Sequence, residues 1–505
     1  MRKKILFWIT TDLIQFYIAY YLQKKDEFDF YAIIDTPYYP KQFFEQQNLV
    51  KFKKIWYLYD FVNKQKTKPN ISYLKIFEKK YDVPLWKLII NERIFYRFYH
   101  FHDYDYDQVL SIDEQICHFY ENVLDEVKPI AFITKEPGFH HLELLNQMCK
   151  TQNIKVMMPF VPKLANKIII SDDPLKIDSD IIYDDIESSN RTFEQLKEIF
   201  QAKNTSGVVK NFLGNFASSK FELLKASFRY LFLSNNKSEE VLYTYYGRTK
   251  LNVLFSMIIS TLKRKYRKSF IDKNLEKNPT LNSPFVYFAM GVDLERNILL
   301  DAPFFTNQIE VIRHVAKSLP IEYKLYVKET SGQSSRDWRS ILEYNQLLKI
   351  PNVCLIHPEY SSKNLLEHSS IVVTIAGSSG FEAAFYEKPS IVFSNTLYTK
   401  LPSVFQVKSP EELPQIVKKA LTTTVKSNDL DKYMTFLEKN SIDFPWHEFE
   451  VKRMNTFSYG GQYLDAPISE EKVKSFLDEN EIMMKDIAQT HLEKLDKLNL
   501  QKENT

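Results

Sequence analysis

Short apolar runs alternate with amphipathic stretches of helical length through the first 173 residues. The runs KILFWI at 4–9 and FYAIID at 30–35 are rich in β-branched and aromatic residues, which is typical of buried strands. Stretches such as 12–24 and 139–152 have the spacing of amphipathic helices. Strands separated by helices of this length favour βαβ units and a parallel sheet. We therefore expect an N-terminal Rossmann-like α/β domain.

A second alternation of the same kind begins at Pro284. Its strand-like runs are PFVYFAMG at 284–291, YKLYVKE at 323–329, NVCLI at 352–356, IVVTIA at 371–376 and SIVF at 390–393. Two doubly wound domains facing across a cleft, with a basic helical linker and C-terminal helices, are the α/β fold class that this pattern predicts. The expected ranges are 1–175 for the N-terminal domain, 176–280 for the linker, 281–425 for the C-terminal domain and 426–505 for the C-terminal helices and tail.

The stretch TIAGSSGFEAAFYEK, from Thr374 to Lys388, places Gly377 and Gly380 three residues apart in a chain that has only ten glycines. They fall between a predicted strand and a predicted helix. Such a turn needs residues that accept positive φ and let a ligand approach the backbone, and the following helix offers free N–H groups to an anion. The alternative is a tight turn in which Ser378 or Ser379 serves as an ordinary helix N-cap.

Composition and charge narrow the class of protein. The 505 residues are 44% hydrophobic and 26% charged, with a net charge of +3, so no overall positive field indicates a nucleic-acid partner. The N-terminal basic and apolar residues resemble a signal peptide, but Asp12 and Gln15 interrupt the apolar run and a first strand is the better interpretation. No run reaches roughly 18 uncharged apolar residues, the length of a membrane span. We expect a cytoplasmic protein.

One segment departs from this near-neutral balance. Residues 209–271 hold twelve lysines and arginines against three glutamates, and the apolar run LNVLFSMIISTL leads directly into KRKYRK at 263–268. A helix over 251–268 can lie on an anionic bilayer surface, which would make the protein peripheral on the inner face of the cell membrane. It can equally be a solvated helix that covers the cleft. Both interpretations stand at this point.

Two stretches of the second half carry a resemblance to a known family: ERNILLDAPFFTNQIEVIRHVAKSLPIEYKLYVKE, and PNVCLIHPEYSSKNLLEHSSIVVTIAGSSGFEAAFYEKPSIVF. Together, over about residues 294–407, they resemble the C-terminal half of the GT-B-fold glycosyltransferases of capsule and surface-polysaccharide biosynthesis. They are also distantly similar to the sugar-nucleotide 2-epimerases. The matching motifs are the strand ending in Lys328-Glu329, the loop and helix at 377–383, and Lys388-Pro389 before the next strand.

The sequence departs from one pattern of that family. Transferases of the Kdo type commonly continue Lys-Glu with His-Pro, whereas here Thr330-Ser331 follows. A His-Pro pair does occur, at His357-Pro358, but it follows the next strand. The resemblance therefore leaves the donor sugar open.

The resemblance implies a nucleotide-sugar donor, which is a substrate, and no metal or other cofactor. Without a metal, N–H groups and cations have to stabilise the charge of the leaving nucleotide. The loop Gly377, Ser378, Ser379 and Gly380 would supply the N–H groups and Lys328 the cation. Glu382 would accept hydrogen bonds from two ribose hydroxyls. Alternatively, Glu382 only offsets the helix dipole and Lys328 is a surface residue.

The catalytic base is expected in the N-terminal domain. Asp12 follows the first strand, and Glu136, His140 and His141 follow the run AFIT. A carboxylate or imidazole at the carboxyl end of a strand can take the proton of an acceptor hydroxyl. Each of these residues also has a plain structural interpretation as a cap or loop residue.

The function that the resemblance implies is glycosyl transfer from a nucleotide-activated donor to a growing surface or capsular polysaccharide, or to a glycolipid acceptor. A sugar-nucleotide 2-epimerase is one alternative, since it shares the two-domain architecture. A non-catalytic scaffold of polysaccharide assembly is another. The expected partners are the nucleotide sugar, the glycan or glycolipid acceptor, and an anionic membrane surface through residues 251–268, with no nucleic acid.

Overall fold

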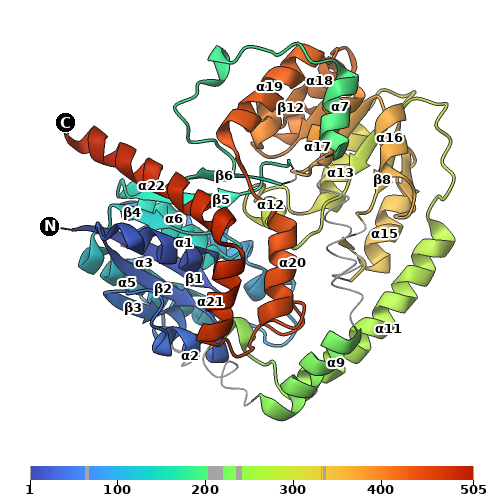
Figure 1. Ribbon diagram of the computed structural model, residues 1–505. Helices are drawn as coiled ribbons and strands as arrows, with labels where there is room; N and C mark the ends of the chain where they lie inside the picture. Colours follow the sequence, from blue (N-terminus) through green and yellow to red (C-terminus); the bar gives the residue numbers. More distant parts are fainter. Residues whose placement is uncertain are drawn as a thin grey trace. The chain divides into compact units, whose positions relative to one another are not determined.

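The computed structural model describes residues 2–62, 68–164, 166–202, 220–234, 242–330, 332–333 and 337–503 (Figure 1). The chain divides into two compact units. Unit 1 comprises Met1–Ser179, Asn204–Val253 and Ser441–Thr505, and unit 2 comprises Asp180–Lys203 and Leu254–Asn440. Residues 180–203, which the sequence suggested as part of a linker, thus belong to unit 2, and residues 441–505 belong to unit 1.

Unit 1 is built on a seven-stranded sheet in the order β13-β6-β5-β4-β1-β2-β3. The strands are β1 (Lys3–Thr10), β2 (Phe28–Asp35), β3 (Lys54–Tyr57), β4 (Ala131–Ile133), β5 (Lys155–Phe160), β6 (Lys167–Ser171) and β13 (Ile442–Asp443). The first five are parallel, in register Ile5–Phe30 and Ile5–Ala131. β6 returns antiparallel to β5 because the short connection at 161–166 leaves no room for a crossover helix.

Helices cover both faces of this sheet because successive residues of β1 point to opposite sides. Phe7 packs with Phe30 on the face that α1 covers, whereas Trp8 packs against Tyr120 of α5 on the other. The helices of unit 1 are α1 (Ile14–Leu22), α2 (Tyr38–Gln46), α3 (Ile71–Tyr81), α4 (Leu85–Ile90), α5 (Tyr106–Val127), α6 (His140–Thr151), α9 (Lys220–Phe228), α20 (Trp446–Phe457), α21 (Glu470–Glu479) and α22 (Glu481–Glu503), with a π-turn, η5 (Arg229–Leu233), after α9.

The C-terminal helices complete the core of unit 1. α1 is buried on nearly all sides, and Tyr17 packs against Phe449 of α20 and Phe476 of α21. Ile487 of α22 is fully buried in the same core, alongside residues of β1 and β2. Residues more than 400 positions apart in the sequence therefore share one hydrophobic core.

Unit 2 is built on a six-stranded sheet that is parallel throughout, in the order β12-β11-β10-β7-β8-β9. Its strands are β7 (Phe285–Ala289), β8 (Lys324–Lys328), β9 (Val353–Ile356), β10 (Ile371–Thr374), β11 (Ser390–Val392) and β12 (Val404–Gln406). Numbered within the unit, this is the order 6-5-4-1-2-3 of the Rossmann fold. The central strands β7 and β10 are buried on both faces, as their continuous apolar runs predicted.

The helices of unit 2 lie on both sides of its sheet. They are α7 (Phe193–Ala202), most of α11 (Lys250–Asn274), α12 (Arg296–Leu299), α13 (Gln308–Lys317), α15 (Ile341–Leu348), α16 (Ser362–His368), α17 (Ser379–Glu382) with the 3-10 turn η7 (Ala383–Tyr386), α18 (Leu413–Leu421) and α19 (Ser427–Asn440). In the part of the chain described here, no helix combines the length and the apolar character that crossing a bilayer requires.

Candidate functional site

The strand order of unit 2 defines where a ligand would bind. The sheet grows outward in both directions from β7 and β10, so the connections that leave these two strands run to opposite sides. In open parallel sheets, ligands bind outside the carboxyl ends of the strands at this switch point. Gly291 follows β7 there, and the loop Gly377–Gly380 follows β10. The loop that the sequence singled out therefore lies at the expected edge.

The glycines of this loop are not in the left-handed region, so the expectation of positive φ is wrong. Close packing explains them instead. A Cβ on Gly377 would lie 2.7 Å from Oγ1 of Thr374, and a Cβ on Gly380 would lie 2.9 Å from the hydroxyl of Tyr398. That hydroxyl also donates a hydrogen bond of 2.5 Å to the carbonyl of Gly377. The loop is thus held tightly against Thr374 and Tyr398.

The polar groups of the loop are arranged differently from those of an ordinary N-cap. Ser378 stands at the N-cap position of α17, but its hydroxyl donates to Oε1 of Glu382 at 2.8 Å and accepts no backbone N–H. The backbone N–H groups of Phe381 and Glu382 bond to the carbonyl of Ser378. Within the described residues, no acceptor is seen for the N–H groups of Ser378 and Ser379, which are partly exposed. These two donors are open to an anion.

Lys328 closes β8 and is only 6% exposed. Its ammonium group donates to the hydroxyl of Ser362 at 2.9 Å. Among the described residues, no carboxylate lies within ion-pair distance of its Nζ. Burial lowers the pKa of Lys328 to about 8, and the charge of Glu329 offsets this only in part. A buried ammonium group without an ion pair favours an anionic ligand, and this environment is not that of a surface lysine.

The surroundings of Lys328 connect it to Glu382. Tyr287 of β7 is buried, and burial raises the pKa of its phenol. A hydrogen bond with Ser362 acts against this rise, and the charge of Glu382 adds to it. Ser362 therefore links the ammonium group of Lys328 to the phenol of Tyr287, and the charge of Glu382 acts on that phenol.

A buried ionic network supports this edge, and sequence reasoning missed it. Arg339, 4% exposed, forms ion pairs with Asp293 and with Glu329, the latter at 2.7 Å, and it donates to the carbonyl of Gly291. Gln308 donates to Asp293 and to the same carbonyl, and accepts from the N–H of Gly291. The network fixes the turn after β7. Of its members, only Glu329 belongs to a motif that the sequence singled out.

In unit 1, Asp12 lies at the equivalent edge, between β1 and β4. Its Oδ2 forms an ion pair with Lys135, and its buried Oδ1 has no hydrogen-bond partner among the described residues. Burial favours the protonated form of Asp12, but the charges of Lys135 and Arg453 outweigh it and lower its pKa. Asp12 is therefore ionised at neutral pH and is a weak base.

His140 is enclosed in the interior. Its two ring nitrogens contact Oε2 of Glu92 and Oδ1 of Asp113, each at 2.9 Å, and its backbone N–H bonds to Glu92 as well. Burial opposes the charged form, yet the two carboxylates raise the pKa of His140 to about 10. An imidazolium with both nitrogens engaged cannot accept a proton at neutral pH. The geometry therefore does not favour His140 as a base.

The remaining unit 1 candidates differ in exposure. Glu136 is partly exposed beyond β4. His141 is buried, with a 2.6 Å hydrogen bond to the hydroxyl of Tyr243 and a contact of 3.4 Å to Oδ2 of Asp35, the last residue of β2. Asp35 was missed, although an acidic residue that closes a strand is the same signal that identified Asp12. The structure brings Asp12, Asp35 and Glu136 to one edge of the unit 1 sheet.

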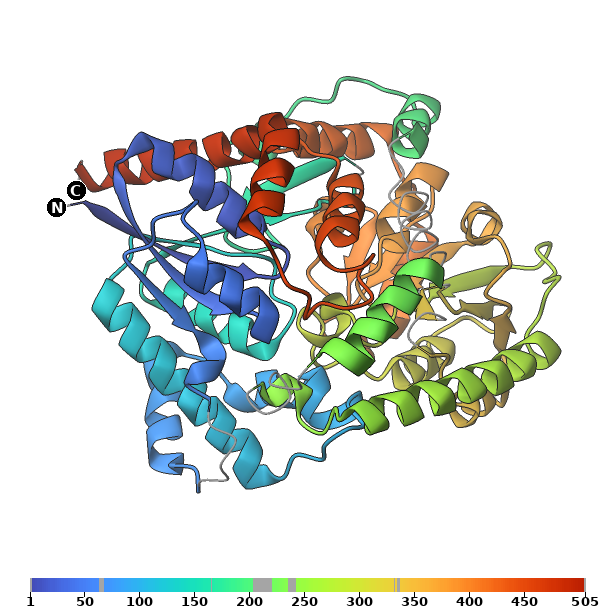
Figure 2. The same cartoon turned by 60° about the horizontal axis from the view of Figure 1, so that its bottom comes forward.

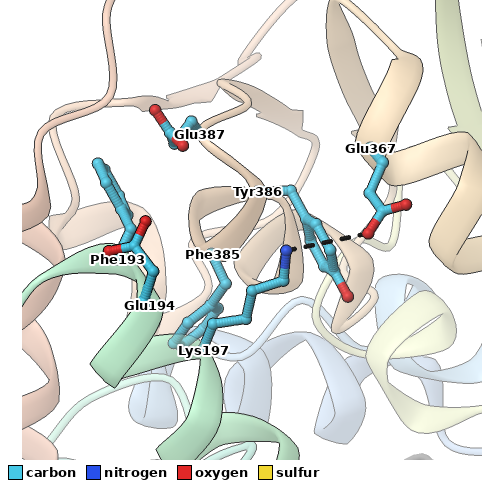
Figure 3. A pocket seen from close by; sticks show the side chains of 7 residues that line it. All are labelled: Phe193, Glu194, Lys197, Glu367, Phe385, Tyr386 and Glu387. Carbon is cyan, nitrogen blue, oxygen red and sulfur yellow. Dashed lines mark ion pairs between the residues drawn. The ribbon is translucent and has the colours of Figure 1, made fainter.

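A separate pocket of about 180 Å³ lies at the far end of η7 (Figure 3). Phe193, Glu194 and Lys197 of α7 line it together with Glu367, Phe385, Tyr386 and Glu387. The ammonium group of Lys197 lies 4.1 Å from the ring centroid of Tyr386 and 3.9 Å from Glu367. Because the glycine loop precedes α17 and this pocket lies where η7 ends, the two are at opposite edges of the unit 2 sheet.

No family model matches the sequence, and no curated protein matches it significantly. Solved structures similar to this chain include KpsC of Thermosulfurimonas dismutans, a beta Kdo 2,7 transferase, at 12% identity over 66% of this chain and 89% of that one, with a TM-score of 0.29. The UDP-GlcNAc 2-epimerase of Methanocaldococcus jannaschii is similar at 12% identity over 87% and 99%, with a TM-score of 0.25. That of Neisseria meningitidis is similar at 15% over 86% and 98%, with a TM-score of 0.22.

One of these proteins is a sugar transferase and two are sugar-nucleotide epimerases, the two kinds of enzyme that the sequence motifs resemble. At such identities and TM-scores, the likeness carries no argument about activity. The strand orders of the two sheets carry the conclusion about fold: the chain consists of two Rossmann-type α/β units.

Proposed function

We propose that this protein is a glycosyltransferase that uses a nucleotide-activated sugar to extend a surface or capsular polysaccharide or a glycolipid. One observation carries the proposal: the buried, ion-pair-free ammonium group of Lys328 closes β8, the neighbour of β7, and the loop after β10 leaves the N–H groups of Ser378 and Ser379 open at the switch point, just before Glu382. A diphosphate beside a ribose is a ligand that matches a cation, N–H donors and a carboxylate acceptor.

In the proposed reaction, the bond between the anomeric carbon and the phosphate oxygen breaks while a bond to the acceptor oxygen forms. Lys328 and the N–H groups of the 377–380 loop stabilise the negative charge that develops on the leaving nucleotide. Glu382 orients the ribose through its hydroxyls. The proton of the acceptor hydroxyl goes to a base, for which Glu136 and Asp12 stay the predicted candidates and His140 is disfavoured by its enclosed position.

The first experiment is a thermal-shift panel of the full chain with uridine, guanosine, cytidine and thymidine nucleotides. A specific ligand at roughly 100 times its Kd stabilises the folded protein by about 2.7 kcal/mol. We expect nucleotides of one nucleobase to raise the Tm of the wild-type protein. The same nucleotides should raise the Tm of Lys328→Met much less. If no nucleotide stabilises the protein, the proposal fails and a scaffold role replaces it.

The second experiment distinguishes transfer from epimerisation. The protein is incubated with the nucleotide sugar that the panel identifies, with and without a short glycan acceptor. Transfer requires the acceptor, whereas an epimerase converts the nucleotide sugar alone. We also propose that the reaction needs no metal, so activity is expected to survive EDTA, and that it takes place in the cytoplasm at the inner face of the cell membrane. Loss of activity in EDTA that Mg²⁺ restores would contradict metal independence.

A further inference from the structure

α11 carries its apolar side chains on the side that faces away from unit 2. Leu254, Phe255, Ile258, Leu262 and Tyr266 recur at intervals of three and four residues, which places them on one face of the helix. Phe255, Ile258, Leu262 and Tyr266 are each 60 to 71% exposed. A helix at the surface of a globular protein normally turns such a face inward. Figure 2 shows α11 as the long yellow-green helix that starts near residue 250.

The opposite face of α11 holds the helix to unit 2 by polar contacts along its middle and by Phe270 and Ile271 near its end. Ser260 donates to Oδ2 of Asp337 at 2.7 Å, and Nε of Arg264 lies 3.5 Å from Oδ1 of the same carboxylate. Arg267 donates to the carbonyl of Trp338. Ile271, near the end of the helix, is its only fully buried residue among those described. The outward apolar face therefore does not belong to the core of unit 2, because the helix is attached to unit 2 through its other face.

The charged residues of α11 along its apolar face are all basic. From Lys250 to Ile271 there is no acidic residue, and five basic residues fall within 263–268. Three of them have contacts within unit 2: Arg264, Arg267 and Lys268, whose ammonium group lies 3.2 Å from Asp272. No carboxylate among the described residues pairs with Lys263 or Lys265, which are exposed. These two charges border the apolar face.

We propose that the outward face of α11, defined by Leu254, Phe255, Ile258, Leu262, Lys263, Lys265 and Tyr266, docks on an anionic lipid bilayer. An exposed apolar face beside unpaired lysines is the arrangement by which interfacial helices insert their apolar side chains at the boundary between headgroups and acyl chains. A second copy of the chain is a poorer occupant, because a symmetric contact would bring two basic faces together. This inference does not depend on the proposed glycosyl transfer.

Unit 1 carries a similar surface of its own. On α9 and η5, Phe221, Leu224, Phe228 and Phe232 are 58 to 70% exposed, and Lys225 and Arg229 lie among them in the sequence. This second surface is an independent instance of exposed apolar side chains interleaved with basic residues. Lys225 is paired with Glu222, so this surface shares the exposed apolar side chains of α11 but not its lysines without an ion pair.

The experiment is cosedimentation of the full chain with vesicles of phosphatidylcholine, either alone or with phosphatidylglycerol added as the anionic lipid. We expect binding to the anionic vesicles only, and release as salt is raised. Replacing Lys263 and Lys265 by Gln should weaken binding by about 25-fold. Replacing Phe255 and Ile258 by Ser should weaken it further. Ile321→Ser and Phe304→Ser, at exposed apolar residues outside α11, are the matched controls and should bind like wild type.

A second measurement covers the case in which the serine variants do not fold. Phe255→Trp should show a blue shift of its fluorescence and quenching by brominated lipid on anionic vesicles, whereas Phe304→Trp should show neither. The proposal is overturned if wild type ignores anionic vesicles, or if the α11 variants bind them as well as wild type. It is also overturned if wild type is a dimer in solution and the Ser variants are monomers with unchanged vesicle binding, because a second copy then covers this face.

Discussion

Lys328 illustrates how burial changes the chemistry of a single side chain. Its residue type and its place at the end of a strand suggested a phosphate-binding cation, but they applied equally to an exposed lysine. The structure adds that its ammonium group is buried and bonded to a serine hydroxyl, with a pKa lowered to about 8. Because that pKa lies close to neutrality, the positive charge that the proposed ligand needs is sensitive to pH.

Nucleotide binding is therefore expected to weaken as pH rises above 8. In the free protein Lys328 loses its proton near pH 8, and each further pH unit lowers the charged fraction, so Kd should rise by at most about tenfold per unit. Calorimetry with the nucleotide identified by the panel measures this between pH 6.5 and 9.5. Lys324→Met, at the exposed opposite end of β8, is the control and should keep the wild-type profile. A flat wild-type profile would remove Lys328 from the binding site.

The contact between Gly377 and Thr374 predicts a coupled pair of substitutions. Gly377→Ala forces a Cβ to 2.7 Å from Oγ1 of Thr374 and should cost about 1–3 kcal/mol of stability. Thr374→Ala removes that oxygen and leaves ordinary contacts, so the double variant should lose less than the sum of the two, by roughly 1 kcal/mol. A double-mutant cycle on unfolding measures this. Gly138→Ala, where a Cβ would meet nothing within 4 Å, should be neutral, and strict additivity would contradict the packing account.

His140 predicts a pH dependence of the stability of unit 1. The pKa of His140 is about 10 in the folded protein against roughly 6.5 when unfolded, so its contribution to folding is complete below pH 6.5 and is lost as pH rises from 6.5 to 10. The loss is at most about 1.4 kcal/mol per pH unit. Unfolding followed over this range, together with NMR titration of the imidazole, tests it. A His140 that titrates near pH 6.5 would contradict the buried charge.

At the scale of elements, the strands that came from apolar runs are confirmed. The apolar runs named from the sequence match β1, β2 and β4 of unit 1 and β7 to β11 of unit 2 within a few residues, because buried parallel strands are continuous apolar segments. β13 was missed because two residues give no pattern to detect, and β12 was missed because it is only partly buried and lacks the continuous apolar run of the equally short β4 and β11. The antiparallel direction of β6 follows from the length of one connection, which the apolar pattern does not report.

The site was predictable only in part, for a related reason. The glycine loop, Lys328 and Glu382 follow strands of one parallel sheet, so their shared edge could be inferred from topology. Arg339 comes from a loop and Gln308 from the start of a helix, and their roles depend on long-range packing. The enclosure of His140 likewise depends on Glu92 and Asp113, which belong to other elements.

A side chain just before α7 makes a set of ionic contacts with α19 that can be tested. Arg191, just before α7, forms an ion pair with the fully buried Asp431 of α19 and also contacts Thr435 and Glu438. Arg191→Met leaves the carboxylate of Asp431 buried without its cation, which should cost about 3–5 kcal/mol. Hydrogen exchange of α7 should rise accordingly. Lys432→Met breaks a surface contact with the carbonyl of Asp184, on the same two segments, and should cost under about 1 kcal/mol. Equal losses of stability in Arg191→Met and Lys432→Met would show that the pair of Arg191 with Asp431 is not what stabilises this part of unit 2.

At the scale of the molecule, each unit has its own sheet and core, but unit 1 is discontinuous in sequence. Nothing in the local pattern of 441–505 indicates which domain these helices complete. Contacts between residues hundreds of positions apart leave no periodic trace, so the sequence suggested a separate C-terminal segment. The expectation that the two domains face across a cleft stays a prediction.

Membership of α22 in unit 1 predicts a difference between two isoleucines on one helix. Ile487 is fully buried in the core that contains β1 and α1, whereas Ile482 is 79% exposed. Ile487→Ala should destabilise unit 1 by about 2–4 kcal/mol, and Ile482→Ala should change stability by less than about 0.5 kcal/mol. Hydrogen exchange of the amides in β1 and α1 measures the stability of unit 1. Unchanged exchange in Ile487→Ala would separate α22 from that core.

The discontinuity of unit 1 also bears on how the chain is made. On the ribosome, residues 1–179 emerge first, yet Phe449, Phe476 and Ile487, which close their core, are synthesised after the whole of unit 2. Residues 441–505 alone require roughly 3 to 13 s at the usual rate of translation. During this interval unit 2 has its full sequence, while α1 of the nascent unit 1 still exposes an apolar surface. Newly made chains should therefore engage holdase chaperones through their N-terminal segment until translation is complete.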